Sequence, residues 1–347
     1  MKRVALLGAT GSIGRQAIEI VESHPDLELC AAASGSSPLD DVDAPLKQVG
    51  GDLTELLERA QPDVVLNAVV GFAGIHATLW TLERGIDLAL ANKESLVAGG
   101  ELVTRLGGRI IPVDSEHSAL FQCLEGQSGV DSLVLTGSGG PFRGRTRDEL
   151  VAVTPEEALA HPTWRMGPKI TIDSATLANK GLELIEAHFL FGVPYERIEV
   201  VLQPTSIVHA LVRFRDGASL AHLGYPDMRV PISYALTYPE RAATPLPALD
   251  LTALTLEFQA PDTETFPMLA LAREAGEKGG TYPCAFNAAN EVAVAAFLEG
   301  RLAFLDIAEL VGDALAAADG SPPRDLDDLL EADRRTRAFA SEGLPVA

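Results

Sequence analysis

Asp114 and Glu116 flank a single serine directly after RIIPV (109–113), which is apolar apart from Arg109. Two ionised carboxylates placed this close repel each other. In an extended chain, residues two apart point to the same side, so we expect both carboxylates to converge on one point. A divalent cation such as Mg²⁺ or Mn²⁺, which prefers hard oxygen ligands, would relieve the repulsion. Taken alone, the pair also fits a solvated loop.

A second stretch, KITIDSATLANKGLELIEAH (169–188), adds groups of the same kind. Its spacing predicts a helix with Asn179, Lys180 and Glu183 on one face. This face would supply a third carboxylate, together with an amide and an ammonium suited to a phosphate. By the same spacing Glu186 is an alternative ligand, and an ordinary surface helix with a Lys–Glu pair would look similar.

Two glycine-containing loops could hold a phosphate and cover a substrate. Ser138 lies in TGSGG (136–140), where backbone amides can form an anion nest, although a flexible turn has the same composition. His161 opens HPTWRMG, in which Trp164 and Met166 could form a lid over an apolar part of a substrate. A structural histidine and a buried tryptophan anchoring a loop are the alternatives.

The first apolar segment runs into GATGSIG, which places Gly8, Gly11 and Gly14 between a strand and a helix. Such glycines permit a tight turn, and the helix start presents amides to a pyrophosphate. Thr10 and Ser12 add hydroxyl donors. The pattern predicts a dinucleotide site, although the spacing differs from the more familiar G-x-G-x-x-G.

The end of the second predicted strand indicates which dinucleotide binds. An NAD site usually carries an acid there, whereas this chain has serines and a glycine at 34–37. This favours NADP, yet Asp40 and Asp41 lie nearby and the next cation is Lys47.

Apolar segments at 3–8, 27–34, 63–70, 86–92 and 109–113 alternate with helical patterns, which predicts a parallel, doubly wound sheet. Further along, alternating segments around Asp216 and Gly217 predict a hairpin and a partly antiparallel sheet. Helical periodicity dominates at the end of the chain.

We therefore expect an α/β protein in three parts. These are a Rossmann-like dinucleotide-binding domain (1–113), a central α/β catalytic domain (114–238) and, after a linker (239–263), a C-terminal helical bundle (264–347). Within the central part, Thr154 should cap one helix in a capping box with Glu157, and Asp173 or Ser174 should cap another.

Composition excludes some partners. The 347 residues carry a net charge of −22, which disfavours nucleic acid and anionic membranes. The three widely spaced cysteines predict a reducing, cytoplasmic setting. We find no apolar run long enough to span a bilayer.

Taken together, these segments resemble the 1-deoxy-D-xylulose 5-phosphate reductoisomerase family. The resemblance covers nearly the whole chain and is carried, in family order, by GATGSIG, LANKESLVAGGE, PVDSEHSALFQCL, LTGSGGPFR, HPTWRMGPKITIDSATLANKGLELIEAHFLF, VLQPTSIVHALV and FNAANEVAVAAFL. It implies a homodimeric enzyme that rearranges its sugar phosphate substrate with a divalent cation, Mg²⁺, Mn²⁺ or Co²⁺. The enzyme then reduces the product with NADPH to 2-C-methyl-D-erythritol 4-phosphate, in non-mevalonate isoprenoid biosynthesis.

The resemblance also implies roles for individual residues. The metal ligands would be Asp114, Glu116 and Glu183, and catalysis would further involve Lys93 and His161. The residues that contact the substrate would be Ser115, Ser138, His161, Trp164, Met166, Ser174, Asn179 and Lys180. The residues that contact the cofactor would be Thr10, Gly11, Ser12, Ile13, Gly35, Ser36, Asn92, Glu94, Gly167 and Met228.

The chain departs from the family pattern after the second strand. Many members have a basic or amide residue there, where this chain has Gly35, Ser36 and Ser37 followed by acids, and the segment looks shortened. A second shortening lies between QCLEGQSG and DSLVLTG. The first departure bears on the choice between NADPH and NADH.

Two other functions fit parts of the sequence. An NADP-dependent aldehyde or semialdehyde dehydrogenase would suit GATG, but the acylating kind needs an activated thiolate, and Cys123 lies in an apolar helical run. A non-catalytic dinucleotide-sensing protein would have no use for three metal carboxylates.

Overall fold

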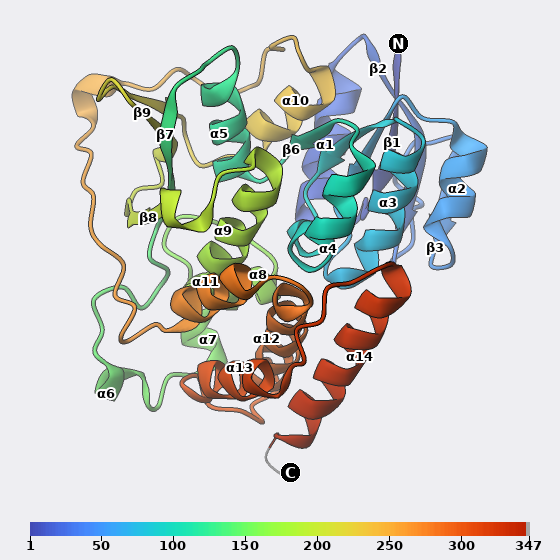
Figure 1. The fold of residues 1–347 in the computed structure, drawn as a ribbon. Coiled ribbons are helices and arrows are strands. Elements are labelled where there is room, and N and C mark those ends of the chain that lie inside the picture. The colour runs from blue at the N-terminus through green and yellow to red at the C-terminus, as the bar shows by residue number, and fades with distance from the viewer. Residues whose placement is uncertain (345–347) are drawn as a thin grey trace.

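The computed structural model describes residues 1–344, and Figure 1 shows a parallel sheet at the N-terminal end. Its six strands lie in the order β3-β2-β1-β4-β5-β6, all parallel. The order reverses between β1 and β4, and ligands of open α/β sheets bind at the carboxyl ends beside such a reversal. The strands are β1 (Lys2–Leu7), β2 (Leu27–Ser34), β3 (Leu46–Val49), β4 (Val64–Asn67), β5 (Asp87–Leu90) and β6 (Ile110–Pro112).

Helices cover both faces of this sheet, as expected for strands whose side chains are apolar on both sides. On one face, Ile18 of α1 and Ile232 of α10 pack with Leu6. On the other face, Leu57 of α2 and Leu96 of α4 pack with the sheet. The helices are α1 (Ser12–Ser23), α2 (Leu53–Ala60), α3 (Ile75–Glu83), α4 (Lys93–Leu106) and α10 (Arg229–Thr237), with a short 3₁₀ turn at Phe72–Gly74.

The central part contains a four-stranded sheet in the order β10-β9-β7-β8, in which only β7 and β8 are parallel. The hairpin between β9 and β10 turns at Gly217, whose φ is +89°, as predicted from Asp216-Gly217. The capping box of Thr154 and Glu157 is also confirmed. The elements are β7 (Val130–Gly137), β8 (Ile198–Leu202), β9 (Val208–Phe214), β10 (Ser219–Leu223), α5 (Ser115–Leu124), α6 (Arg147–Leu150), α7 (Pro155–Ala158), α8 (Pro168–Thr176) and α9 (Ala178–Phe191), with a 3₁₀ turn at Tyr195–Arg197.

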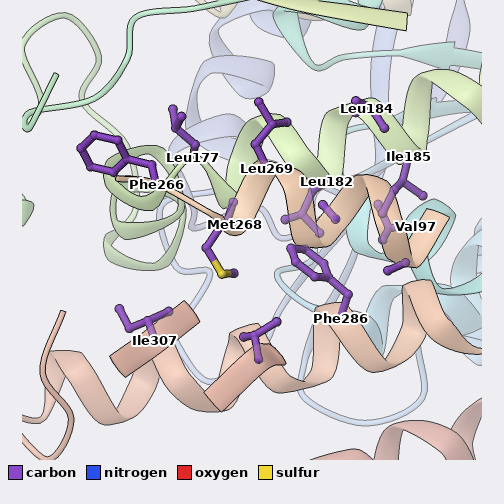
Figure 2. Close-up of a cluster of buried hydrophobic side chains, with 14 of the residues drawn as sticks. Val97, Leu177, Leu182, Leu184, Ile185, Phe266, Met268, Leu269, Phe286 and Ile307 are labelled. Atoms are coloured by element: carbon purple, nitrogen blue, oxygen red, sulfur yellow. The ribbon is translucent and has the colours of Figure 1, made fainter. Parts of the chain in front are cut away.

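Four helices end the chain: α11 (Met268–Lys278), α12 (Tyr282–Leu298), α13 (Asp306–Ala317) and α14 (Leu326–Glu342). Residues 239–263 before them hold only a 3₁₀ turn at Leu251–Ala253 and a bridge from Gln259 to Leu202. Figure 2 shows Leu182 of α9 packing with Met268 of α11 and Phe286 of α12. The helical region therefore shares one core with the central sheet.

One local prediction was wrong, and one strand was not predicted. Asp173 and Ser174 do not cap a helix, because they lie inside α8, which ends where Leu177 takes a left-handed φ of 65°. Strand β3 was not predicted, because its four residues LKQV form an edge strand with alternate side chains exposed. No helix within residues 1–344 is long and apolar enough to cross a membrane.

Candidate active site

A cavity of about 170 Å³ lies where the N-terminal sheet, the central part and the loop before α8 meet. Every residue predicted for catalysis, metal or substrate lines it: Lys93, Asp114, Ser115, Glu116, Ser138, His161, Trp164, Met166, Ser174, Asn179, Lys180 and Glu183. Of the predicted cofactor residues, Ser12, Ile13, Gly167 and Met228 line the same cavity.

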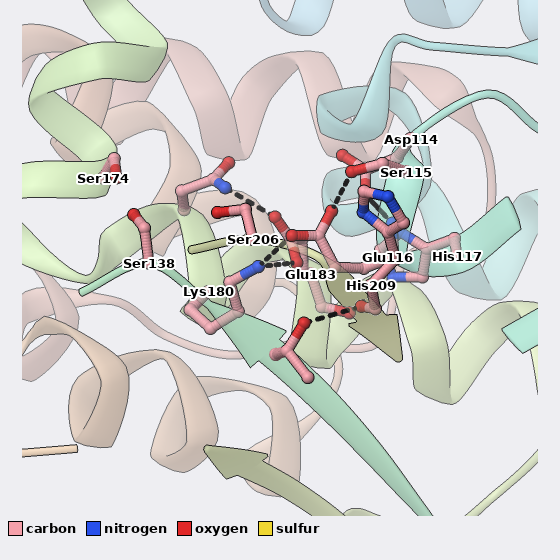
Figure 3. Close-up of polar contacts among 12 residues, drawn as sticks. Asp114, Ser115, Glu116, His117, Ser138, Ser174, Lys180, Glu183, Ser206 and His209 are labelled. Atoms are coloured by element: carbon pink, nitrogen blue, oxygen red, sulfur yellow. Dashed lines mark hydrogen bonds and ion pairs between the residues drawn. The ribbon is translucent and has the colours of Figure 1, made fainter. Parts of the chain in front are cut away.

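Asp114, Glu116 and Glu183 converge from two helices, with one oxygen from each lying within 4.8 Å of the others (Figure 3). The expected extended geometry at Asp114 and Glu116 was wrong. Asp114 is the N-cap of α5 and accepts a bond from the backbone N–H of Glu116, which lies in the first helical turn. The side chains still meet, because the helix start turns the chain and Glu183 approaches from α9.

Two lysine ammonium groups neutralise this cluster. Lys93 Nζ lies 2.6 Å from Asp114 Oδ2 and 3.3 Å from Glu183 Oε1. Lys180 Nζ lies 2.8 Å from Glu116 Oε1 and 2.5 Å from Glu183 Oε2. Without these cations, one buried and two partly buried carboxylates this close together would be costly to ionise. The oxygens and their spacing suit a hard divalent cation, which would take over the role of the ammonium groups.

The same balance sets the pKa values. Burial alone would raise the pKa of Asp114, but Lys93 and His117 outweigh it and hold this pKa well below its usual range. The pKa of Glu183 is raised, because burial and the negative charge of Glu116 outweigh the attraction of Lys180. Asp114 is therefore held in its ionised form, and a cation would favour ionised Glu183.

A second buried pair lies behind the carboxylates. His117 Nδ1 is 3.2 Å from Asp114 Oδ1 and 3.2 Å from Glu186 Oε2, and Nε2 is 2.9 Å from the carbonyl oxygen of Glu183. Burial would lower the pKa of His117, but Glu186 and Asp114 raise it to about 9. His117 thus holds two ligand-bearing segments together. Glu186 pairs with it rather than joining the metal cluster, although spacing made Glu186 an alternative ligand.

Polar side chains at the other end of the cavity form a cup. His161 Nε2 is 3.1 Å from both Ser138 Oγ and Ser174 Oγ. Its Nδ1 accepts bonds from the backbone N–H groups of Thr163 and Trp164, so Nε2 carries the proton of the neutral ring. Burial, and then the charge of Lys180, lowers the pKa of His161 to about 4. The cup therefore offers three neutral hydrogen-bonding groups beside an ammonium.

Asn179 and Ser115 connect the two halves. Asn179 accepts a bond from Lys93 Nζ (2.9 Å) and donates one to Glu183 Oε1 (2.5 Å). Ser115 donates to Glu116 Oε2 at 2.6 Å. Both side chains thus orient the charged groups of the cluster.

The loop from His161 to Gly167 lies over the cavity and has no regular secondary structure. Trp164 faces His209 at a ring distance of 6.3 Å, and Met166 lines the cavity. Pro168 begins α8 directly after the loop. A short segment fixed at both ends fits the predicted lid.

The glycine loop has the close approaches that a dinucleotide site needs. A Cβ on Gly8, whose φ is +87°, would lie 2.3 Å from the carbonyl oxygen of Ala68, and one on Gly14 would lie 2.2 Å from that of Gly8. Asn92 and Glu94 are buried outside the cavity lining. Asn92 donates to the carbonyl oxygens of Val69 and Gly71. Thr10, Gly11, Gly35 and Ser36 also lie outside the lining.

Several residues near the site were not predicted. His117 follows Asp114 by three positions on a helix, a spacing that could have identified it. Lys169 Nζ lies 3.0 Å from Glu94 Oε1 and 2.9 Å from Asp173 Oδ2. The i, i+4 spacing of Lys169 and Asp173 on one helix could have indicated the second pair. Arg165 lines the cavity from within HPTWRMG, so that segment was its signal. His209 carries no comparable local signal, because the fold alone brings it beside Trp164.

Comparisons with known proteins give one answer. Residues 4–53 and 40–100 match the model for 1-deoxy-D-xylulose 5-phosphate reductoisomerase, residues 110–191 match the model for its C-terminal domain, and residues 223–339 match a DXP reductoisomerase C-terminal domain. The 1-deoxy-D-xylulose 5-phosphate reductoisomerases of Mycobacterium avium and Chloroherpeton thalassium are 49% and 45% identical. The match to the Mycobacterium avium protein covers 99% of this chain and 93% of that protein. The match to the Chloroherpeton thalassium protein covers 98% of this chain and 97% of that protein.

Solved structures agree. The Zymomonas mobilis reductoisomerase in complex with NADPH is 38% identical, with a TM-score of 0.88 over 98% of both chains. A DOX-P reductoisomerase in complex with NADPH, fosmidomycin and magnesium is 37% identical, with a TM-score of 0.90, and covers 99% of this chain and 98% of its own.

Proposed function

The chain belongs to the 1-deoxy-D-xylulose 5-phosphate reductoisomerase family, and we propose that the cavity described above is where its reaction takes place. The enzyme rearranges 1-deoxy-D-xylulose 5-phosphate and reduces the product with NADPH to 2-C-methyl-D-erythritol 4-phosphate. The observation that carries the assignment of the site is the convergence of Asp114, Glu116 and Glu183 in the cavity that also holds the serine–histidine cup.

The three carboxylates are proposed to hold the divalent cation. When bound, the cation supplies Lewis acidity toward the ketone and hydroxyl oxygens of the substrate, which stabilises negative charge that develops on those oxygens. Lys93 and Lys180, which pair with Asp114 and Glu116, would then be free to face the substrate. Asp114 stays ionised readily, because Lys93 and His117 hold its pKa well below its usual range.

Ser138, Ser174 and His161 are proposed to bind the substrate phosphate, together with Lys180 and Asn179. The neutral ring of His161 can donate one hydrogen bond from Nε2 while Nδ1 keeps the lid loop in place. Phosphate binding far from the reacting carbons would supply energy for orientation and for closure of Trp164 and Met166. Lys93 and Ser115 are proposed to contact the substrate hydroxyls.

The glycine loop and Met228 are proposed to hold NADPH, whose nicotinamide supplies the hydride. Ser12, Ile13, Gly167 and Met228 support this, because they line the same cavity as the carboxylates. Six further residues are proposed to contact the cofactor outside that cavity: Thr10, Gly11, Gly35, Ser36, Asn92 and Glu94. A homodimer and a cytoplasmic location are further proposals, which rest on the family resemblance and the cysteine content.

The test is NADPH oxidation, followed at the nicotinamide absorbance band, by purified protein supplied with 1-deoxy-D-xylulose 5-phosphate and Mn²⁺. We expect oxidation that EDTA abolishes and that excess Mn²⁺ restores. Oxidation that survives complete metal removal would instead favour a plain dehydrogenase, and folded protein that binds NADPH without turnover would favour a sensor.

A further inference from the structure

The loop after β2 carries no arginine or lysine to meet the extra phosphate of NADPH. It begins with a turn in which the Ser34 hydroxyl donates to the carbonyl oxygen of Ser37. It then folds back onto α1, where Leu39 and Val42 are buried with Ile18. Because residues 35–46 contain three aspartates and no cation, any positive charge here must come from other elements.

Arg15 in the first turn of α1 supplies one such charge. Its Nη1 lies 2.6 Å from Asp41 Oδ2 of this loop, with the side chains 43% and 64% exposed. Arg15 directly follows Gly14, so it stands at the helix start to which a pyrophosphate binds. The adenosine ribose of a dinucleotide is read at the neighbouring carboxyl end of β2.

Lys47 supplies a second charge from β3, the strand that pairs with β2. Hydrogen bonding and attraction from Arg15 lower the pKa of Asp41, and the charge of Lys47 adds to this effect. The Asp41 carboxylate therefore occupies the anion position beside Arg15, and Lys47 adds only a weaker attraction from the neighbouring strand. An exposed ion pair is worth little, so a stronger anion can displace the carboxylate at small cost.

We propose that Arg15, assisted by Lys47, recognises the 2′-phosphate of NADPH in this chain. Asp41 pairs with the Arg15 guanidinium until the phosphate replaces it. A phosphate offers a doubly charged, two-point partner for the planar guanidinium, which a single carboxylate matches less well. The inference rests on the proposed function only in taking NADPH as the cofactor. It explains how the dinucleotide can be selected although the loop itself is acidic.

The experiment measures binding of two fragments, 2′,5′-ADP and 5′-AMP, by calorimetry, without substrate or turnover. We expect wild-type protein to bind 2′,5′-ADP more tightly. Arg15→Gln should weaken 2′,5′-ADP by roughly tenfold or more and leave 5′-AMP unchanged. Lys47→Gln should weaken it by a smaller factor, and Asp41→Asn should tighten it by removing the competing charge. Arg59→Gln, at an exposed arginine of α2, is the matched control and should change neither affinity.

The proposal is overturned if wild-type protein binds the two fragments equally, or if Arg15→Gln weakens both fragments alike. It is equally overturned if Asp41→Asn weakens 5′-AMP, because Asp41 would then be binding a ribose hydroxyl as in an NAD site. None of these outcomes depends on metal or on turnover. A failure of the reductoisomerase assay is therefore separable from a failure of this inference.

Discussion

At the scale of residues, the site is a problem of charge balance. Glu183 is fully buried and accepts contacts from Lys93, Lys180 and Asn179, so none of these side chains is independent of the others. Types and spacing were enough to single out the carboxylates and Lys180, whereas Lys93 was named only through the family resemblance. The pairing of His117 with Glu186 could not be predicted, because it joins two helices far apart in the sequence.

Lys180 gives a direct test of this balance. We expect Lys180→Ala to raise the KM for the sugar phosphate by roughly ten- to a hundredfold, because one cation beside the phosphate cup is lost. The change should also lower the melting temperature, since Glu116 and Glu183 lose their shared partner, and saturating Mn²⁺ should recover much of that loss.

The measurements are steady-state kinetics and thermal unfolding with and without Mn²⁺. Lys278→Ala is the control, because Lys278 forms an exposed ion pair with Glu274. An unchanged KM for Lys180→Ala would remove this residue from the phosphate site.

At the scale of elements, two short segments decide whether the site can form. One is the break between α8 and α9, where Leu177 turns the chain and brings Ser174 and Asn179 to the same cavity. No glycine or proline interrupts the helical pattern at residues 174–179, so this break could not be predicted from the residues. The hairpin at Gly217 was predictable because its turn residues mark it.

The glycine loop is the second such segment, and Gly14→Ala tests it. Alanine is normally favoured over glycine inside a helix by about 1 kcal/mol. Here its Cβ would lie 2.2 Å from the carbonyl oxygen of Gly8, so we expect destabilisation of about 1–3 kcal/mol and weaker NADPH binding.

Denaturant unfolding and fluorescence titration with NADPH measure both effects. Gly312→Ala in α13 is the matched control, since the nearest atom to its added Cβ, Leu271 Cδ2, lies 4.0 Å away. Equal stability of the two variants would show that the turn at Gly14 relaxes freely.

The lid loop makes stability depend on pH through His161. Its pKa falls from 6.5 to about 4 on folding, so the unfolded state binds the proton more readily. The contribution of the neutral ring is therefore complete above about pH 6.5 and is lost as the pH falls toward 4. Below pH 6.5, wild-type protein should lose melting temperature faster than His161→Gln.

Thermal unfolding at several pH values from 7.5 to 4.5 measures this difference, with His76→Gln at an exposed position of α3 as the control. Parallel pH profiles for wild-type protein and His161→Gln would contradict the role given to Nδ1.

At the scale of the whole molecule, a strongly acidic chain builds a site for anionic ligands by collecting cations locally. Lys93 comes from α4 beside the N-terminal sheet and Lys180 from α9, while α9 packs on the C-terminal helices in one shared core. The parallel sheet and the final helices were predictable from periodicity. The core that the final helices share with the central sheet could not be predicted in this way. It is formed by apolar side chains from segments far apart in the sequence.

The central claim is that Asp114, Glu116 and Glu183 bind one divalent cation. The most direct measurement is calorimetric titration of metal-free protein with Mn²⁺ for wild type, Glu183→Gln and Glu186→Gln. We predict one site in wild type, no measurable site in Glu183→Gln, and a retained site in Glu186→Gln that is weakened by roughly 10–100-fold at most, because Glu186 acts only through His117. Wild-type affinity in Glu183→Gln, or equal loss in both variants, would contradict the account.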